Sequence, residues 1–386
     1  MSKRFQLVGS LLRPRDLLQF KRQIEDRDDI TYPFYSDFPG YQECESKSVK
    51  AVVDKQIEHG ITVLTDGEHT KSLWHLDFVW GLQGVERYIA RHGYFFRDKD
   101  GKTSYETRKD IGLRIVAPLS GKNHHFIEVF KQLQCISQAQ AAKLCIPSPS
   151  HILGELSWSD NIGGATSIYK DRQELADALV LAYTQFITDF AHAGGKILQL
   201  DDCLWELFAD DNPNSPYTGK QVNQETVQAL ARAFIEINNT IIDHGHSLGL
   251  QMWTHNCRGN YDSRNMGEGS YEKIADLFLK QLNYDRFFLE WDDERAGSLK
   301  ALQVFKEKPN VEIVLGLLSS KTHTLDDENR TIRMIQEASQ ILPKERLFLS
   351  HQCGFASCDE GNELSEEEQW AKIDQGQKIA QAFWGE

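Results

Sequence analysis

The sequence lacks the features that would define a membrane, secreted or nucleic-acid-binding protein. It has no apolar run of about 18 residues, the length that a membrane-spanning helix needs. The apolar stretch near the N-terminus meets Gly9 too soon to be the core of a secretion signal. Basic residues number 43 against 57 acidic ones, and the formal net charge of -14 disfavours nucleic acids and anionic membrane surfaces as partners.

Cysteine is present, but not in a pattern that suggests disulfides. The seven cysteines are an odd number and are scattered along the chain, which is typical of a reducing compartment. We therefore expect a cytoplasmic protein. Internal repeats, low-complexity tracts and Pro/Gly/Ser-rich linkers are missing as well, so the sequence predicts a single domain over residues 1–386.

Short apolar runs alternate with longer amphipathic stretches along most of the chain. Each short run is typical of a buried strand, and eight strands with intervening helices predict a single (β/α)8 TIM barrel. An open doubly wound sheet is the alternative, although its Gly-rich phosphate fingerprint is not found. The predicted strands are Gln6–Gly9, Ile61–Leu64, Leu144–Ile146, Ile197–Leu200, Leu250–Trp253, Arg286–Leu289, Glu312–Leu317 and Arg346–Leu349. The clearest predicted helices are Leu175–Ala193, Gln224–His244, Tyr271–Leu282 and Asp326–Ile341.

Residues 93–121 interrupt this alternation. Asp98–Gly101 is typical of a hairpin turn, and it lies between Tyr94–Arg97 and the apolar run Ile111–Val116. We therefore expect a β-hairpin inserted between strands two and three of the barrel. Further on, Ser365 precedes three glutamates, which indicates the start of a C-terminal helix.

Residues with metal-ligand potential follow several strands where they end, and in a barrel these ends meet at one rim. His255 and Cys257 are two residues apart, so both side chains point to the same side of an extended segment. Glu290 and Cys353 follow two further strands. Two thiolates, an imidazole and a carboxylate suit tetrahedral zinc. Such an electron-rich site favours activating a thiol over splitting water.

Other interpretations of the same residues stay open. A His-x-Cys pair is more often part of a packed core, and Glu290 alone is more often a salt-bridged carboxylate. His351 and Cys358 are rival ligands, and Cys203 is either a rim residue or a small buried side chain.

A second group of strand-end residues suggests an amino-acid pocket. The Ser10 hydroxyl with loop N–H groups could take a carboxylate, while Glu68 and Asp201 could take an ammonium group. The alternative is ordinary turn chemistry, since Gly-Ser and Asp-Gly-Glu are common in loops.

Six segments, in order along nearly the whole chain, resemble the catalytic domain of cobalamin-independent methionine synthase. Each motif is weak alone, but the ordered set is specific. Arg258–Asn260 after the fourth segment is similar to the short single-domain members of that family. The six segments are Leu7–Ser10, Leu64–Glu68, Leu198–Asp202, Thr254–Cys257, Phe288–Glu290 and Gln352–Phe355.

The resemblance implies a zinc-dependent methyltransferase on a TIM barrel. A methyl group would pass from a donor of the 5-methyltetrahydrofolate type to the thiol of homocysteine, giving methionine. The implied zinc ligands are His255, Cys257, Glu290 and Cys353, and the implied homocysteine-binding residues are Ser10, Glu68 and Asp201.

The chain departs from the family at the methyl-donor end. Lys321 stands where the family has a histidine suited to proton transfer. Asp202 and Cys203 replace the Glu and the Pro that the family has at these positions. Trp158 would correspond to a tryptophan that stacks on the pterin, with a packing role as the alternative. Full-length members of the family have a second barrel before this one, which helps to hold the folate tail. We expect none in this chain, so the identity of the methyl donor is open.

Three further hypotheses compete with this one. A related zinc alkyltransferase would use another thiol, such as coenzyme M, or another methyl donor. A zinc hydrolase would need a site with fewer thiolates, and a non-enzymatic metal binder would have a closed site. A homodimer or a methyl-carrier protein is the partner that such an enzyme could require.

Overall fold

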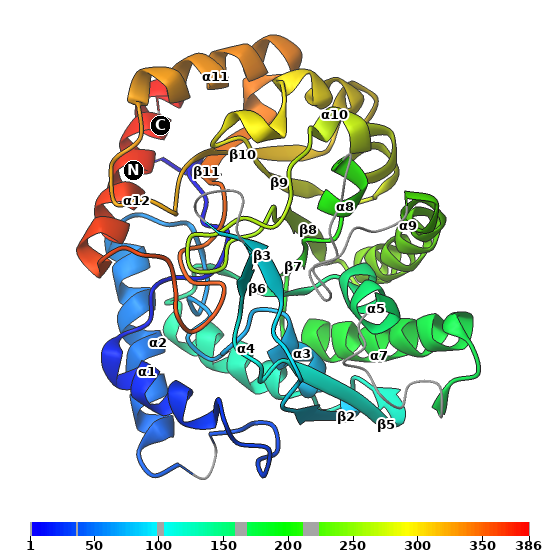
Figure 1. Cartoon of the computed structure of the whole chain (residues 1–386). Coiled ribbons are helices and arrows are strands. Elements are labelled where there is room, and N and C mark those ends of the chain that lie inside the picture. Colours follow the sequence, from blue (N-terminus) through cyan, green and yellow to red (C-terminus); the bar gives the residue numbers. More distant parts are fainter. Residues whose placement is uncertain (1, 36–37, 99–103, 159–167, 211–223, 386) are drawn as a thin grey trace.

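The computed structural model describes residues 2–35, 38–98, 104–158, 168–210 and 224–385. A parallel seven-stranded sheet in the order β1-β6-β7-β8-β9-β10-β11 curls through the centre of the molecule (Figure 1). Its strands are β1 (Val63–Leu64), β6 (Ala141–Pro147), β7 (Ile197–Asp202), β8 (Gln251–Asn256), β9 (Arg286–Glu290), β10 (Glu312–Leu318) and β11 (Leu347–His351). Seven of the eight predicted strands therefore form.

The strands are buried because side chains cover both faces of the sheet, as a parallel sheet requires. Every residue of β7, β9 and β11 is buried. Apolar side chains from five strands and the N-terminal segment form a cluster of their own, apart from the main core. They are Val8, Ile197, Trp253, Phe288, Val314 and Phe348. This is the packing expected inside a TIM-like barrel.

The first predicted strand, Gln6–Gly9, forms a bridge instead of a full strand. Phe5 pairs in parallel with Leu349 of β11, and the Gln6 N–H donates to the Leu349 carbonyl at 2.9 Å. On its other side the Thr65 hydroxyl donates to the Gly9 carbonyl at 2.8 Å. The segment thus lies between the first and last strands of the sheet, an arrangement consistent with a TIM-like barrel.

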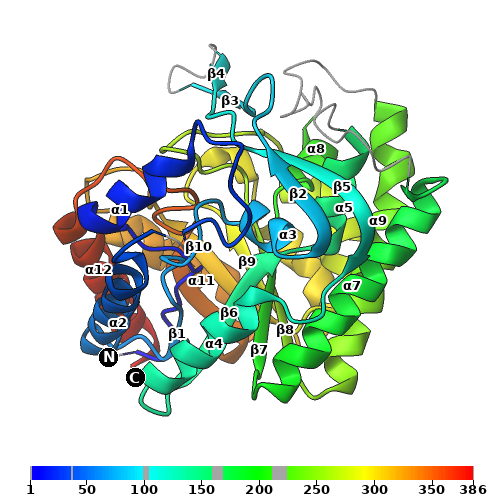
Figure 2. The same cartoon turned by 90° about the horizontal axis from the view of Figure 1, so that it is seen from below.

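Helices surround the sheet (Figures 1 and 2). Of the predicted helices, Tyr271–Leu282 is the exception, because its regular part ends at Ile274 and a single π-helical turn, Ala275–Leu279, follows. The helix after Ser365 forms with a complete capping box. The helices are α1 (Arg15–Lys21), α2 (Tyr41–Glu58), α3 (Leu76–Trp80), α4 (His125–Ile136), α5 (Pro149–Trp158), α7 (Arg172–His192), α8 (Glu206–Ala209), α9 (Gln224–Ser247), α10 (Tyr271–Ile274), α11 (Glu328–Ile341) and α12 (Glu366–Trp384).

The single hairpin predicted for residues 93–121 is not confirmed. β3 (Phe95–Arg97) pairs antiparallel with β4 (Ser104–Glu106), whereas the later apolar run lies in β5 (Gly112–Ser120) and pairs with β2 (Gln83–Tyr88). The run pairs elsewhere because β5 needs a partner long enough to cover it, and β3 has only three residues. Figure 2 shows β3 and β4 at the edge of the molecule, where the Arg97 N–H donates to the Asn265 carbonyl at 2.9 Å.

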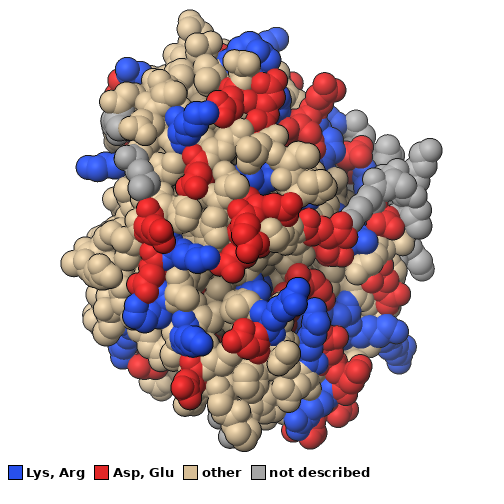
Figure 3. Space-filling view, turned by 90° about the vertical axis from the view of Figure 1, so that its left-hand side faces the viewer, with Lys and Arg blue, Asp and Glu red and all other residues tan. Residues whose placement is uncertain are grey.

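Within the described ranges, no helix is long and apolar enough to cross a membrane. Figure 3 shows acidic and basic side chains interspersed over the face that it presents.

Candidate active site

Four predicted metal ligands lie together at the carboxyl ends of the strands. His255 is near the end of β8 and Cys257 follows that strand, Glu290 ends β9, and Cys353 lies two residues beyond β11. One potential ligand atom from each of the four lies within 4.8 Å of the others. None of the four residues is more than 7% exposed, and the two thiols are 3.8 Å apart. Three separate strand ends thus supply one compact donor set.

The unpartnered atoms of this set show that it fits a metal ion. Neither ring nitrogen of His255 has a hydrogen-bond partner in the described part of the chain, and neither does Glu290 Oε2. The other Glu290 oxygen accepts from the Arg258 N–H at 3.1 Å. Leaving such atoms buried and unpaired is costly, so a bound cation would compensate them. Imidazole, carboxylate and thiolate donors suit a divalent ion such as zinc.

The electrostatics of the donors point the same way. Burial raises the pKa of Glu290 to about 8. Contact with Cys203 raises the pKa of Cys257 well above its ordinary value, and contact with Cys257 together with burial does so for Cys353. Without a cation these groups are therefore held in their neutral forms. A divalent ion would favour their charged forms, because it supplies the missing positive charge.

The rival ligands lie outside this four-residue group. Cys203 contacts Cys257 and Cys353 and lines the same cavity, but it is not part of the compact donor set. The imidazole of His351 packs edge-on against the rings of Phe5 and Phe355. Cys358 also lines the cavity without joining the donor set, and all seven cysteines are free thiols.

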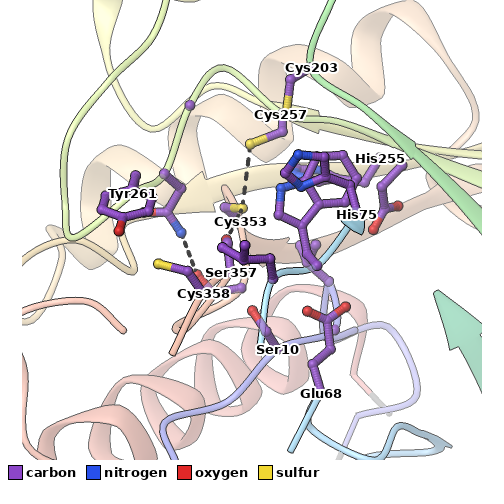
Figure 4. A pocket seen from close by; sticks show the side chains of 18 of the residues that line it. Ser10, Glu68, His75, Cys203, His255, Cys257, Tyr261, Cys353, Ser357 and Cys358 are labelled. Carbon is purple, nitrogen blue, oxygen red and sulfur yellow. Dashed lines mark hydrogen bonds between the residues drawn. The ribbon is translucent and has the colours of Figure 1, made fainter. Parts of the chain in front are cut away.

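The predicted amino-acid-binding residues line the same cavity as the thiols (Figure 4). Glu68 and Asp201 offer carboxylate oxygens within a second compact group, which has Cys145 as its third member. Asp201 Oδ1 accepts from the Gln199 side-chain amide at 2.7 Å, and Glu68 Oε1 accepts from Lys71 Nζ at 3.1 Å. Burial and the nearby Glu68 raise the pKa of Asp201 to about 8. A substrate ammonium group would relieve this repulsion between carboxylates.

Ser10 lies where two loops meet. Its Oγ accepts from the Ala356 N–H at 3.2 Å, and its carbonyl accepts from the Phe355 N–H at 2.8 Å. A Cβ on Gly354 would come within 2.1 Å of Ser10 Oγ, so glycine is needed for the loops to approach this closely. The contact fixes Ser10 at the cavity wall.

The positions of the two residues predicted to act on the methyl donor, Lys321 and Trp158, are less clearly related to the cavity. Lys321 Nζ donates to the Gly259 carbonyl at 3.0 Å and to the Asn265 side chain, and Lys321 is not among the described residues that line the cavity. Trp158 ends α5, but its side chain lies outside the described part of the chain. Their roles in donor binding and proton transfer stay predictions.

The cavity has an aromatic wall that the sequence analysis did not identify. It encloses about 700 Å³, counted out to its open mouth. The missed residues sit in loops and in the insertion, where no periodic pattern marks them; the short motif Trp74-His75 was the one available signal. They are Trp74, His75, Tyr94, Phe96, Tyr261 and Met266.

A curled parallel sheet with polar side chains gathered at its carboxyl ends defines an α/β enzyme of the TIM-like barrel class. Residues 25–366 match the family described as the cobalamin-independent synthase catalytic domain. The chain belongs to this family and is a methionine synthase-like methyltransferase. The resemblance expected from the six ordered motifs is therefore confirmed.

Individual relatives agree with the family and with its fold. The chain is 35% identical over 378 residues to the uncharacterized protein YxjH of Bacillus subtilis, covering 98% of this chain and 93% of that one. It is similar to a Listeria monocytogenes structure assigned provisionally as a vitamin-B12 independent methionine synthase, with 30% identity, coverage of 98% and 97%, and a TM-score of 0.69. A B12-independent methionine synthase of Shewanella sp. W3-18-1, solved with selenomethionine, shares the fold at 18% identity, coverage of 99% and 98%, and a TM-score of 0.71.

Proposed function

We propose that this protein transfers a methyl group from a small-molecule donor to the thiol of homocysteine, with zinc held by His255, Cys257, Glu290 and Cys353. One observation carries the proposal. Four buried donors, several of their atoms unpartnered, converge beside a cavity that Glu68 and Asp201 also line. Family membership supplies the reaction class, a methyl transfer.

Each residue has a defined task in this proposal. The Glu68 and Asp201 carboxylates bind the substrate ammonium group, and the Ser10 hydroxyl binds its carboxylate, so the thiol points at the four donors. Zinc, when bound there, would keep a thiol deprotonated near neutral pH. The substrate sulfur then attacks the methyl carbon, and the donor leaves with the electron pair of the broken bond. Holding both reactants in line lowers the barrier by several kcal/mol.

The methyl donor would enter along the aromatic wall. A methyl group on a tertiary amine leaves only if that nitrogen is protonated, so a folate-type donor needs an acid in this region. Lys321 is the residue predicted for that task, and Trp158 is the residue predicted to stack on the donor. Both assignments depend on the resemblance to the family.

Metal content and thiol coordination test this proposal. We expect zinc in the wild-type protein, bound by His255 and its three partner ligands. This ion should be lost in Cys257→Ser and in Cys353→Ser. On adding homocysteine, X-ray absorption at the zinc edge should show one more sulfur neighbour in the wild type. A folded wild type whose zinc spectrum contains no sulfur ligands would refute the mechanism.

A further inference from the structure

A second cluster of ligand-type side chains lies beside the aromatic wall and has no task in the proposed thiol chemistry. His75 lies in the turn that opens α3, whereas His151 and Glu155 are four residues apart on α5 and so share one face of that helix. One potential ligand atom from each of the three lies within 4.8 Å of the others. None of the three residues is more than 6% exposed.

The cluster contains three buried polar atoms without a hydrogen-bond partner among the described residues. They are His75 Nδ1, His151 Nδ1 and Glu155 Oε2. The other Glu155 oxygen accepts from the Tyr94 hydroxyl at 2.5 Å. Unpaired buried polar groups are costly, so the orphaned His75 Nδ1 and Glu155 Oε2, with the His151 ring converging on them, favour a shared cation.

The charge of the cluster favours a cation as that missing partner. The ion-pair contact that Glu155 makes within the described ranges is with His75 Nε2, at 3.6 Å, which is too long for a hydrogen bond. A divalent ion between the Glu155 carboxyl group and the two imidazoles would supply the positive charge that this contact lacks.

A carboxylate also stands behind one of the imidazoles. Asp202 Oδ1 lies 3.7 Å from His151 Nδ1, and the hydroxyls of Ser148 and Ser150 donate to Asp202 Oδ2 at 2.6 and 2.5 Å. Asp202 faces Nδ1 and so leaves Nε2 of His151 for a metal. Metal-binding histidines usually have such a carboxylate on their second nitrogen, where it sets the ring orientation. The surroundings of His151 therefore match those of a metal ligand.

We propose that His75, His151 and Glu155 bind a second divalent transition-metal ion, zinc or iron(II), at the aromatic wall. Two imidazoles and one carboxylate are the donor set of sites with three protein ligands, which keep a position for water or an oxygen ligand. His75 lines the main cavity, and His75 and His151 line a smaller pocket that shares Trp74 and Cys203 with it. A ligand at the open position would thus lie next to the space proposed for the methyl donor. The metal site itself does not depend on the thiol chemistry.

Metal stoichiometry with four variants tests the second site. Each protein is saturated with zinc, freed of excess ion, and analysed for metal and for thermal melting. We expect about two ions per chain in the wild type and about one in His151→Ala, in Glu155→Gln and in Cys257→Ser. The exposed His192→Ala is the matched histidine control and should keep both ions.

Cobalt(II) substitution gives a second readout that separates the two sites. Cobalt bound by thiolates shows intense near-ultraviolet charge-transfer bands, whereas a site of two imidazoles and a carboxylate shows only weak visible bands. In Cys257→Ser the visible bands should remain after the thiolate bands weaken or disappear. In Glu155→Gln the thiolate bands alone should remain.

The outcomes distinguish failure of this inference from failure of the proposed function. One ion per chain that survives in His151→Ala and Glu155→Gln but not in Cys257→Ser would overturn the second site. One ion per chain that is lost in His151→Ala and Glu155→Gln but kept in Cys257→Ser would support the second site and refute the thiol centre. If both cluster variants unfold, a cobalt titration of the wild type decides: a single, thiolate-only phase would overturn the inference.

Discussion

Replacing Asp201 by Asn tests the proposed amino-acid pocket most directly. Asp201 is buried, lies in the cavity beside Glu68, and pairs in register with the proposed zinc ligand His255 on the neighbouring strand. The substitution keeps the shape of the side chain and its contact with Gln199, but it removes the charge that the substrate ammonium would meet. We expect weaker homocysteine binding with no loss of metal.

The size of the effect follows from two opposing contributions. Removing one partner of a buried charged pair costs about 2–5 kcal/mol. The pKa of Asp201 is raised to about 8 in the empty pocket, so ionising the wild-type carboxyl at pH 7 costs about 1.4 kcal/mol. The net loss in Asp201→Asn is then about 0.6–3.6 kcal/mol, or roughly three- to 400-fold in Kd. Raising the pH from 7 through 8 removes the ionisation cost, so only the wild type gains affinity from Asp201 over that range.

Calorimetric titration with two thiols isolates the ammonium contact. 4-Mercaptobutanoate is homocysteine without its amino group, so it should bind equally well to the wild type and to Asp201→Asn. The Kd of homocysteine should differ between the two proteins by the factor above. Equal losses for both thiols would refute the assignment, because the substitution would then have acted on the metal or on the shape of the pocket.

Three further substitutions test other parts of the structure. Cys203→Ala should leave the metal content unchanged, since Cys203 lies outside the four-residue donor set, and loss of metal would make it a ligand. Burial lowers the pKa of His124 to about 4. The stability that depends on the neutral imidazole is therefore present above its ordinary pKa and is lost as the pH falls through 4. His124→Gln should remove about 3 kcal/mol of this acid-side loss, measured by melting curves from pH 7 to 4. In Gly376→Ala the new Cβ would lie 2.1 Å from the Phe5 ring, and overpacking should cost about 1–3 kcal/mol in denaturant unfolding; an unchanged midpoint would mean that the N-terminal segment shifts freely.

The sequence predicted the strands well because each is a short apolar run buried on both faces. The same property marks where each strand ends, and a polar residue directly after it must lie at the carboxyl edge of the sheet. His255, Glu290 and Asp201 were found in this way, and the structure brings the first two together in one donor set. Gln6–Gly9 was less regular because it bridges two strands mainly through side-chain and single backbone contacts.

The insertion was predicted poorly because pairing within it depends on contacts that leave little trace in the sequence. β2 (Gln83–Tyr88) is largely polar and half-exposed, so no apolar pattern revealed it as the partner of β5. Tyr94 and His75 reach the cavity only because the insertion and the turn before α3 fold back over the strand ends. Such placement follows from tertiary packing, which overrides local propensity.

The cavity is therefore lined by two groups of residues, one placed by the strands of the sheet and the other by the loops and the insertion. The thiol side is set by strand register: Asp201 faces His255 across β7 and β8, and a slip of one residue would turn both side chains to the other face of the sheet. The aromatic wall is set by loops and by the insertion, whose composition can change without disturbing the sheet. Recognition of the methyl donor should therefore be decided by Trp74, His75 and Tyr94, and their replacement should alter donor use while homocysteine affinity stays unchanged.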